Sequence, residues 1–113
     1  MHEYSLVVSL IEILNKISIE KGVDKIKKVN IILGPFGGIE KESIKFYYNF
    51  LVKENNLLKD SKLSFKKQKI KIKCLNCLKD FETEKMVKEC KYCGSNKLRI
   101  METDEMILKS IEV

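Results

Sequence analysis

Cys74-Leu-Asn-Cys77 and Cys90-Lys-Tyr-Cys93 are the two stretches that decide the organisation of this chain. They contain all four cysteines of the 113-residue sequence, and twelve residues separate them. A Cys-x2-Cys turn places two sulfur atoms on one side of a metal ion, and two such turns complete a tetrahedral shell. The spacing therefore predicts a zinc-ribbon module held by Zn²⁺ at Cys74, Cys77, Cys90 and Cys93.

Four core cysteines, two disulfides and a single iron ion are the alternatives for the same four residues. We expect no secretory signal, because Glu12 interrupts the first apolar stretch, and no run approaches the ~20 apolar residues of a membrane span. A cytoplasmic, membrane-free location keeps thiols reduced and favours metal ligation over disulfides. The chain has no fifth cysteine and its only histidine is His2, so we expect the zinc to be structural rather than catalytic.

Hydrophobic periodicity predicts the remaining elements. Apolar residues recur at helical spacing over 4–17 and again over 44–51, and they alternate as in a strand over 29–33. The alternation changes phase between 63–65 and 70–72, which implies a bend over 66–69. Residues 106–113 predict a final strand that returns to the first sheet.

These elements predict an α+β fold, with a small sheet and two helices plus the inserted zinc-ribbon module. We expect the core domain to comprise 1–69, with 99–113 returning to its sheet, and the module to comprise 70–98. The module has few apolar residues of its own, so metal binding is expected to drive its folding.

The amino terminus offers a second set of metal donors. The His2 imidazole, a terminal amine and neighbouring backbone amides could present several nitrogen atoms in one plane, as Ni²⁺ and Cu²⁺ prefer. The other interpretation is a solvated histidine at a chain end. Glu3 has two interpretations as well, a metal ligand or an acidic residue that stabilises the start of the first helix.

The positive charge raises a different function. The formal net charge is +6, and lysines surround the cysteine module, as expected of a zinc-ribbon adaptor that binds nucleic acid or serves transcription. However, sixteen acidic residues are interleaved with the basic ones, and Arg99 is the only arginine. A solvated lysine-rich surface is the simpler explanation. An enzyme is not expected, since the sequence provides no nucleophile and base pair and no phosphate-binding glycine loop.

Several segments together resemble the HypA/HybF family of hydrogenase nickel-maturation metallochaperones. They are the opening Met1-His2-Glu3-Tyr4-Ser5, Val29-Asn30-Ile31-Ile32-Leu33-Gly34, Gly38-Ile39-Glu40, the two Cys-x2-Cys motifs, and Asp104-Glu105-Met106 through Ile111-Glu112-Val113. The resemblance covers essentially the whole chain in order. One departure is Gly34-Pro35-Phe36-Gly37, which stands where the family more usually has Gly-Glu.

The resemblance implies a nickel carrier whose 1–69 domain binds Ni²⁺ as cargo. His2 is then the principal nickel ligand, assisted by backbone nitrogens near residues 2 and 3, with Glu3 and Glu40 as further candidates. The implied partners are a nickel-handling GTPase and the large-subunit precursor of a nickel-iron hydrogenase. Nucleic acid and membrane are not among them.

Overall fold

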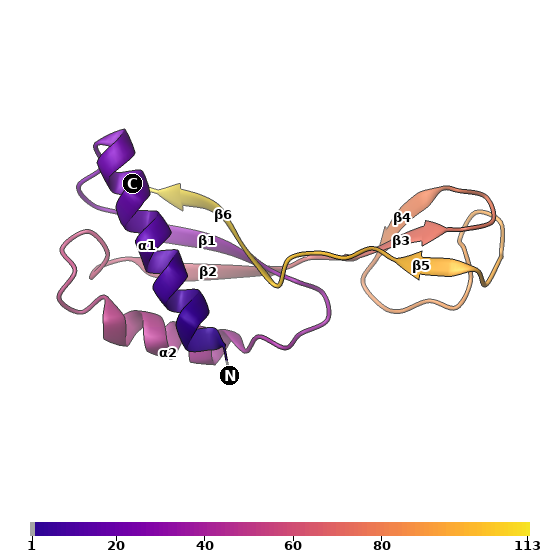
Figure 1. The fold of residues 1–113 in the computed structure, drawn as a ribbon, viewed down its shortest axis with the longest axis horizontal. Helices are drawn as coiled ribbons and strands as arrows, with labels where there is room; N and C mark the ends of the chain where they lie inside the picture. Colours follow the sequence, from indigo (N-terminus) through magenta and orange to yellow (C-terminus); the bar gives the residue numbers. More distant parts are fainter. Residues whose placement is uncertain (1) are drawn as a thin grey trace.

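Two units joined by a pair of extended segments make up the computed structural model, which describes residues 2–113 (Figure 1). Its principal extents are 54 × 29 × 17 Å and its radius of gyration is 17.8 Å. A compact chain of about this length has a radius of gyration of about 13 Å. The excess reflects the separation of the two units along the long axis.

The first unit begins with helix α1, Glu3–Lys21, whose residues Val7, Leu10 and Leu14 are buried. Their three- and four-residue spacing places them on one side of the helix. Gly22 ends the helix in a left-handed conformation (φ 66°), which glycine adopts without steric cost. Helix α2, Lys41–Leu51, buries Ile44 and Tyr48 by the same periodicity.

A three-stranded sheet in the order β2-β1-β6 lies beside these helices. Its strands are β1 (Lys28–Leu33), β2 (Lys62–Lys67) and β6 (Met106–Glu112). β1 pairs parallel with β2, and α2 provides the connection that a parallel pair requires. β6 pairs antiparallel with β1, so the end of the chain joins the first unit.

The apolar residues of β6 change phase along the strand. Met106, Leu108 and Ile111 all pack against the core, although the first two are even-numbered and the third is odd. The pairing register with β1 shifts so that Lys109 has no partner there, as in a β-bulge. The extra residue lets Ile111 return to the same face as Leu108.

A buried hydroxyl pair lies within the core of the first unit. Tyr48 Oη lies 2.6 Å from Ser61 Oγ, and the Ser61 hydroxyl donates to the carbonyl of Leu58 at 2.6 Å. Burial raises the pKa of Tyr48, so the phenol stays protonated at neutral pH. These bonds fasten α2 to the segment that leads into β2.

The second unit is a three-stranded antiparallel sheet in the order β4-β3-β5. Its strands are β3 (Ile70–Cys74), β4 (Asp80–Thr83) and β5 (Leu98–Ile100). Its buried cluster consists of Ile70, Ile72, Phe81 and two cysteines, Cys74 and Cys90. This core is much smaller than that of the first unit, where eleven hydrophobic residues are buried in one cluster.

The predicted α+β fold, with two helices, small sheets and clustered cysteines, is confirmed. The phase change over 66–69 is the passage from one sheet to the other, because β2 ends at Lys67 and β3 begins at Ile70. β4 and β5 were not predicted. β5 continues to Ile100, so Arg99 and Ile100 pair within the second sheet. No helix among residues 2–113 is long and apolar enough to cross a bilayer.

Candidate metal centres

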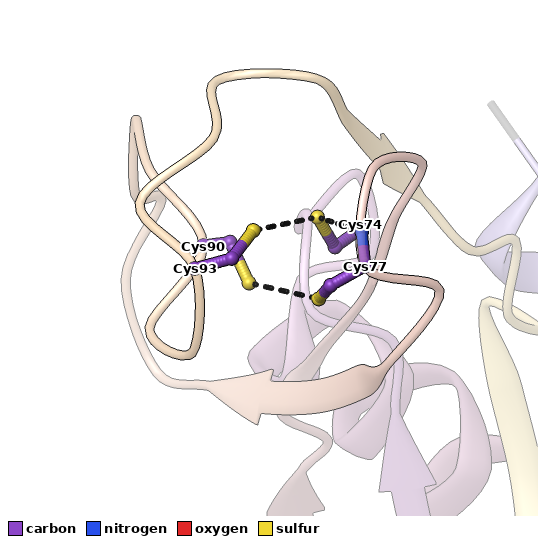
Figure 2. Close-up of side chains that lie close together, drawn as sticks. All are labelled: Cys74, Cys77, Cys90 and Cys93. Atoms are coloured by element: carbon purple, nitrogen blue, oxygen red, sulfur yellow. Dashed lines mark hydrogen bonds between the residues drawn. The ribbon is translucent and has the colours of Figure 1, made fainter.

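The four cysteines converge at one end of the second unit (Figure 2). Cys74 Sγ lies 3.5 Å from Cys93 Sγ, Cys77 Sγ lies 3.7 Å from Cys90 Sγ, and all four sulfurs are within 4.8 Å of one another. Four sulfurs bound at ~2.3 Å to one tetrahedral zinc ion would be separated by about 3.8 Å. A disulfide requires about 2.05 Å. The cysteines are therefore free thiols arranged at the spacing of a tetrahedral metal site.

Both motifs fold into the same turn. The Cys74 N–H donates to the Lys79 carbonyl, and the Cys74 carbonyl accepts from the Leu78 N–H. Cys90 makes the equivalent two bonds, with the Ser95 carbonyl and the Gly94 N–H. The residue four positions after the first cysteine is left-handed in both turns, with φ 64° at Leu78 and 75° at Gly94. This repeated geometry aims two sulfurs from each turn at a common point.

Hydrogen bonds to sulfur favour thiolates in these turns. The Cys77 N–H donates to Cys74 Sγ at 3.4 Å, and the Tyr92 N–H donates to Cys90 Sγ at 3.3 Å. The Ser95 N–H and then the Asn76 amide, which lies 3.7 Å from the sulfur, lower the pKa of Cys93 to about 6. Charge-assisted bonds of this kind stabilise the form of cysteine that binds metal.

Cys77 shows the opposite effect. The Lys79 N–H favours its thiolate, but burial and the neighbouring sulfurs of Cys74, Cys90 and Cys93 outweigh that bond and raise the pKa of Cys77 to about 11. Four thiolates so close together repel one another unless a cation lies among them. The donor set is therefore suited to a divalent, thiophilic metal ion.

The predicted nickel residues lie in the first unit. His2 immediately precedes α1 and makes no side-chain capping bond. The first N–H groups of a helix have no intrahelical acceptor, so the backbone nitrogens of His2 and Glu3 are free of the helical ladder. Glu3, only 8% exposed, is the one charged side chain buried among residues 2–113. The Met1 amine lies outside the described residues.

Glu40 and Glu105 directly precede two other elements of the first unit, α2 and β6. Glu40 is the exposed residue directly before α2, and its carbonyl accepts the Ile44 N–H at 3.2 Å. Glu105 precedes β6, and its Oε2 lies 2.6 Å from His2 Nε2. Glu40 and Glu105 line the same cavity of about 390 Å³.

The structure thus gathers the predicted residues to different degrees. In the described chain, the cysteines are the one set of three or more Cys, His, Asp or Glu whose ligand atoms all lie within 4.8 Å. His2, Glu3 and Glu40 do not form such a set. Glu105 was not predicted, since nothing in its local sequence indicates contact with a residue 103 positions away.

The fold and the cysteine cluster define a small two-unit metal-binding protein with one four-thiol centre. The model of the family described as hydrogenase/urease nickel incorporation, metallochaperone, HypA matches residues 1–113. The chain therefore belongs to the HypA family of nickel-incorporation metallochaperones, as the sequence resemblance indicated.

Individual relatives agree with this membership. The chain is 34% identical over 114 residues to hydrogenase maturation factor HypA of Caldanaerobacter subterraneus subsp. tengcongensis, covering 100% of this chain and 99% of that protein. It is 32% identical to the protein of the same name from Aquifex aeolicus, covering 100% and 97%. The solution structure of the nickel metallochaperone HypA from Helicobacter pylori is similar at a TM-score of 0.72 and 27% identity, covering 99% and 97%.

The two left-handed turn residues lead to a first prediction. Leu78 is 67% exposed and left-handed, so Leu78→Gly should relieve about 1 kcal/mol of backbone strain with little loss of burial. Gly94→Leu should impose a similar cost on the equivalent turn. Chemical denaturation of the metal-loaded protein, followed through the amides of β3, should give a higher midpoint for Leu78→Gly than for wild type and a lower midpoint for Gly94→Leu. Midpoints that shift in the same direction would contradict the equivalence of the turns.

Proposed function

We propose that this protein binds Ni²⁺ at its amino terminus and delivers it for maturation of a nickel-iron hydrogenase. The observation that carries the proposal is the position of His2. Its ring is exposed, and the backbone nitrogens of residues 2 and 3 are outside the helical hydrogen-bond ladder. Nitrogen donors of this kind suit Ni²⁺, and family membership supports nickel as the cargo.

A terminal site suits a cargo that must be released. A ligand set at a chain end can exchange its ion when a partner offers competing donors, whereas a closed cage retains it. We assign the recipient as the hydrogenase large-subunit precursor and the nickel-handling GTPase as the second partner. The names of the curated relatives, hydrogenase maturation factors, support this pathway.

The four-cysteine centre has a different role in the proposal. We assign it structural Zn²⁺ rather than nickel or iron, because zinc prefers closed tetrahedral thiolate shells in reduced proteins. Cys74, Cys77, Cys90 and Cys93 would hold the ion, and its charge would remove the repulsion among their sulfurs. This assignment makes the second unit, with β3 to β5, a zinc-binding module and the first unit a nickel-binding domain. Neither metal centre is assigned a catalytic step, so the protein acts as a carrier rather than an enzyme.

The nucleic-acid adaptor receives less support from the surface of the module. Tyr92, its exposed aromatic residue in the second turn, has the amines of Lys79 and Lys91 at 5.0 and 5.2 Å from its ring centre. Phe81 lies edge-on to the same ring at 6.1 Å. Bases stack on free aromatic faces in single-strand binders, and here lysines already contact the ring. Steeply salt-dependent DNA binding would favour the adaptor instead.

Loss of a single sulfur tests the zinc assignment. Cys74→Ser or Cys93→Ser should release zinc and unfold the second sheet, because only Ile70, Ile72 and Phe81 accompany the cysteines in its buried cluster. The first unit should stay folded on its own larger core. Elemental analysis measures the zinc, and amide hydrogen exchange compares β3 with β1. The matched control is Leu75→Ser, an exposed position in the first turn; full zinc occupancy in both cysteine variants would refute the assignment.

His2→Ala tests the nickel site. It should abolish nickel binding with little cost to stability, because half of the His2 side chain is exposed and the chain has no other imidazole. The measurement is calorimetric titration of Ni²⁺ into the untagged, zinc-loaded protein. Residues appended before Met1 should also weaken binding if the terminal amine is a ligand. Unchanged affinity and stoichiometry in His2→Ala would exclude the proposed carrier mechanism.

The two acidic candidates should differ in their effects. Glu3→Gln should weaken nickel binding more than Glu40→Gln, because Glu3 is buried beside His2 whereas Glu40 is exposed and starts a different helix. A negative charge close to a bound cation stabilises it most where water screens least. The same titration compares the variants, with circular dichroism to check that α1 is intact. A larger loss in Glu40→Gln would reverse this order.

A further inference from the structure

The contact between His2 and Glu105 joins the two ends of the chain. His2 Nε2 and Glu105 Oε2 lie 2.6 Å apart, although 103 positions separate the residues. The two side chains are 50% and 59% exposed, and an ion pair this exposed contributes little to stability. The contribution of this contact to the free energy of folding is therefore too small to explain why a histidine and a carboxylate lie together here.

The backbone holds Glu105 in this place. The Gly34 N–H donates to the Glu105 carbonyl at 2.8 Å, where the chain leaves β1 and enters β6. A Cβ atom at position 34 would lie 2.8 Å from the Asp104 carbonyl oxygen and 3.4 Å from Glu105 Cα. Only glycine leaves room for so close an approach. Gly34 therefore holds the backbone of Glu105 against the end of β1.

The contact also determines where the imidazole carries its proton. An ionised carboxylate accepts hydrogen bonds and cannot donate them, so the nitrogen that faces Glu105 must bear hydrogen. In a neutral ring, protonation at Nε2 leaves an unshared electron pair on Nδ1. Nδ1 is the nitrogen nearer to the backbone.

An unprotonated Nδ1 is the ring nitrogen that a chelate at the start of the chain requires. A metal ion bound to the backbone nitrogen of His2 and to Nδ1 of the same residue closes a six-membered ring, whereas Nε2 lies on the far side of the imidazole. Histidines that bind metals commonly donate their second N–H to a carboxylate, which fixes the tautomer and raises the basicity of the ligating nitrogen. Glu105 lies in that position relative to His2, with its Oε2 2.6 Å from Nε2.

We propose that Glu105 is the positioning residue of the nickel site. Its carboxylate accepts the Nε2 proton of His2 and leaves Nδ1 free for the Ni²⁺ cargo. The inference rests on the proposed function, since it assigns a partner to the same histidine. It adds a residue from the connection between β5 and β6 to a site otherwise built from the start of the chain.

Nickel titration of four zinc-loaded, untagged proteins tests the assignment. Glu105→Leu removes the acceptor and should weaken binding about 10- to 100-fold, the usual effect of losing such a partner. Glu105→Gln keeps an amide oxygen that can accept the proton, so its loss should be smaller. Glu102→Leu makes the same change at an exposed carboxylate on the same connection and should match wild type. An equal loss of nickel affinity in Glu102→Leu would show that the effect comes from the loss of a negative charge in this segment, and it would overturn the proposal.

The second readout needs no nickel. Because the chain has one histidine, its ring nitrogens give a single set of signals in ¹⁵N magnetic resonance. In wild type the neutral ring should be the Nε2–H tautomer, and Glu105→Leu should show the mixture of the two tautomers of a solvated imidazole. Unchanged ring signals with unchanged nickel affinity in Glu105→Leu would refute the role of Glu105.

The variant His2→Ala distinguishes failure of the carrier proposal from failure of the positioning role of Glu105. If His2→Ala loses nickel and Glu105→Leu does not, the carrier proposal stands and only the role of Glu105 fails. If His2→Ala retains nickel at wild-type affinity, the proposed function itself fails. Tighter binding in Glu105→Leu would show that Glu105 competes with nickel for the ring, which also overturns the positioning role.

Discussion

Repulsion among four sulfur atoms within 4.8 Å is the constraint on which the second unit depends. The pKa values of its thiols diverge, to about 6 at Cys93 and about 11 at Cys77, because not all of them can be ionised together without a cation. Two of the cysteines, Cys74 and Cys90, are themselves members of the small buried cluster, so the unit has little apolar packing to hold it closed. A divalent ion would remove the repulsion and join two turns whose backbone bonds are already equivalent, which couples metal binding to folding.

The first unit does not share this dependence. Its helices and sheet bury eleven hydrophobic residues in one cluster, and the Tyr48–Ser61 pair satisfies the buried polar atoms between them. Such a unit can carry a site at its edge without relying on that site for stability. The two proposed centres thus differ physically: two turns converge on the cysteine site, whereas the proposed nickel ligands lie at a chain end, where donors can be exchanged.

Local periodicity and spacing made much of this structure predictable. Helical apolar spacing located both helices, alternation located β1, and paired Cys-x2-Cys turns predicted the sulfur cluster. β4 was not predicted because only Phe81 among its four residues is buried, and one buried residue gives no recognisable alternation. The His2–Glu105 contact was not predicted for another reason. It depends on the close approach of residues 104–105 to Gly34, a tertiary contact that has no local sequence signal.

The segment 101–105 gives the two units a physical connection at its two ends. The Met101 N–H donates to the Lys71 carbonyl of β3 at 2.8 Å, and the Glu105 carbonyl accepts from Gly34 at the end of β1. Four residues further from the second sheet, the Glu105 side chain contacts His2. A change of orientation of the second unit that strains this segment therefore acts on the partner of the His2 ring. By linkage, any such effect on nickel affinity requires an equal effect of nickel on the orientation of the second unit.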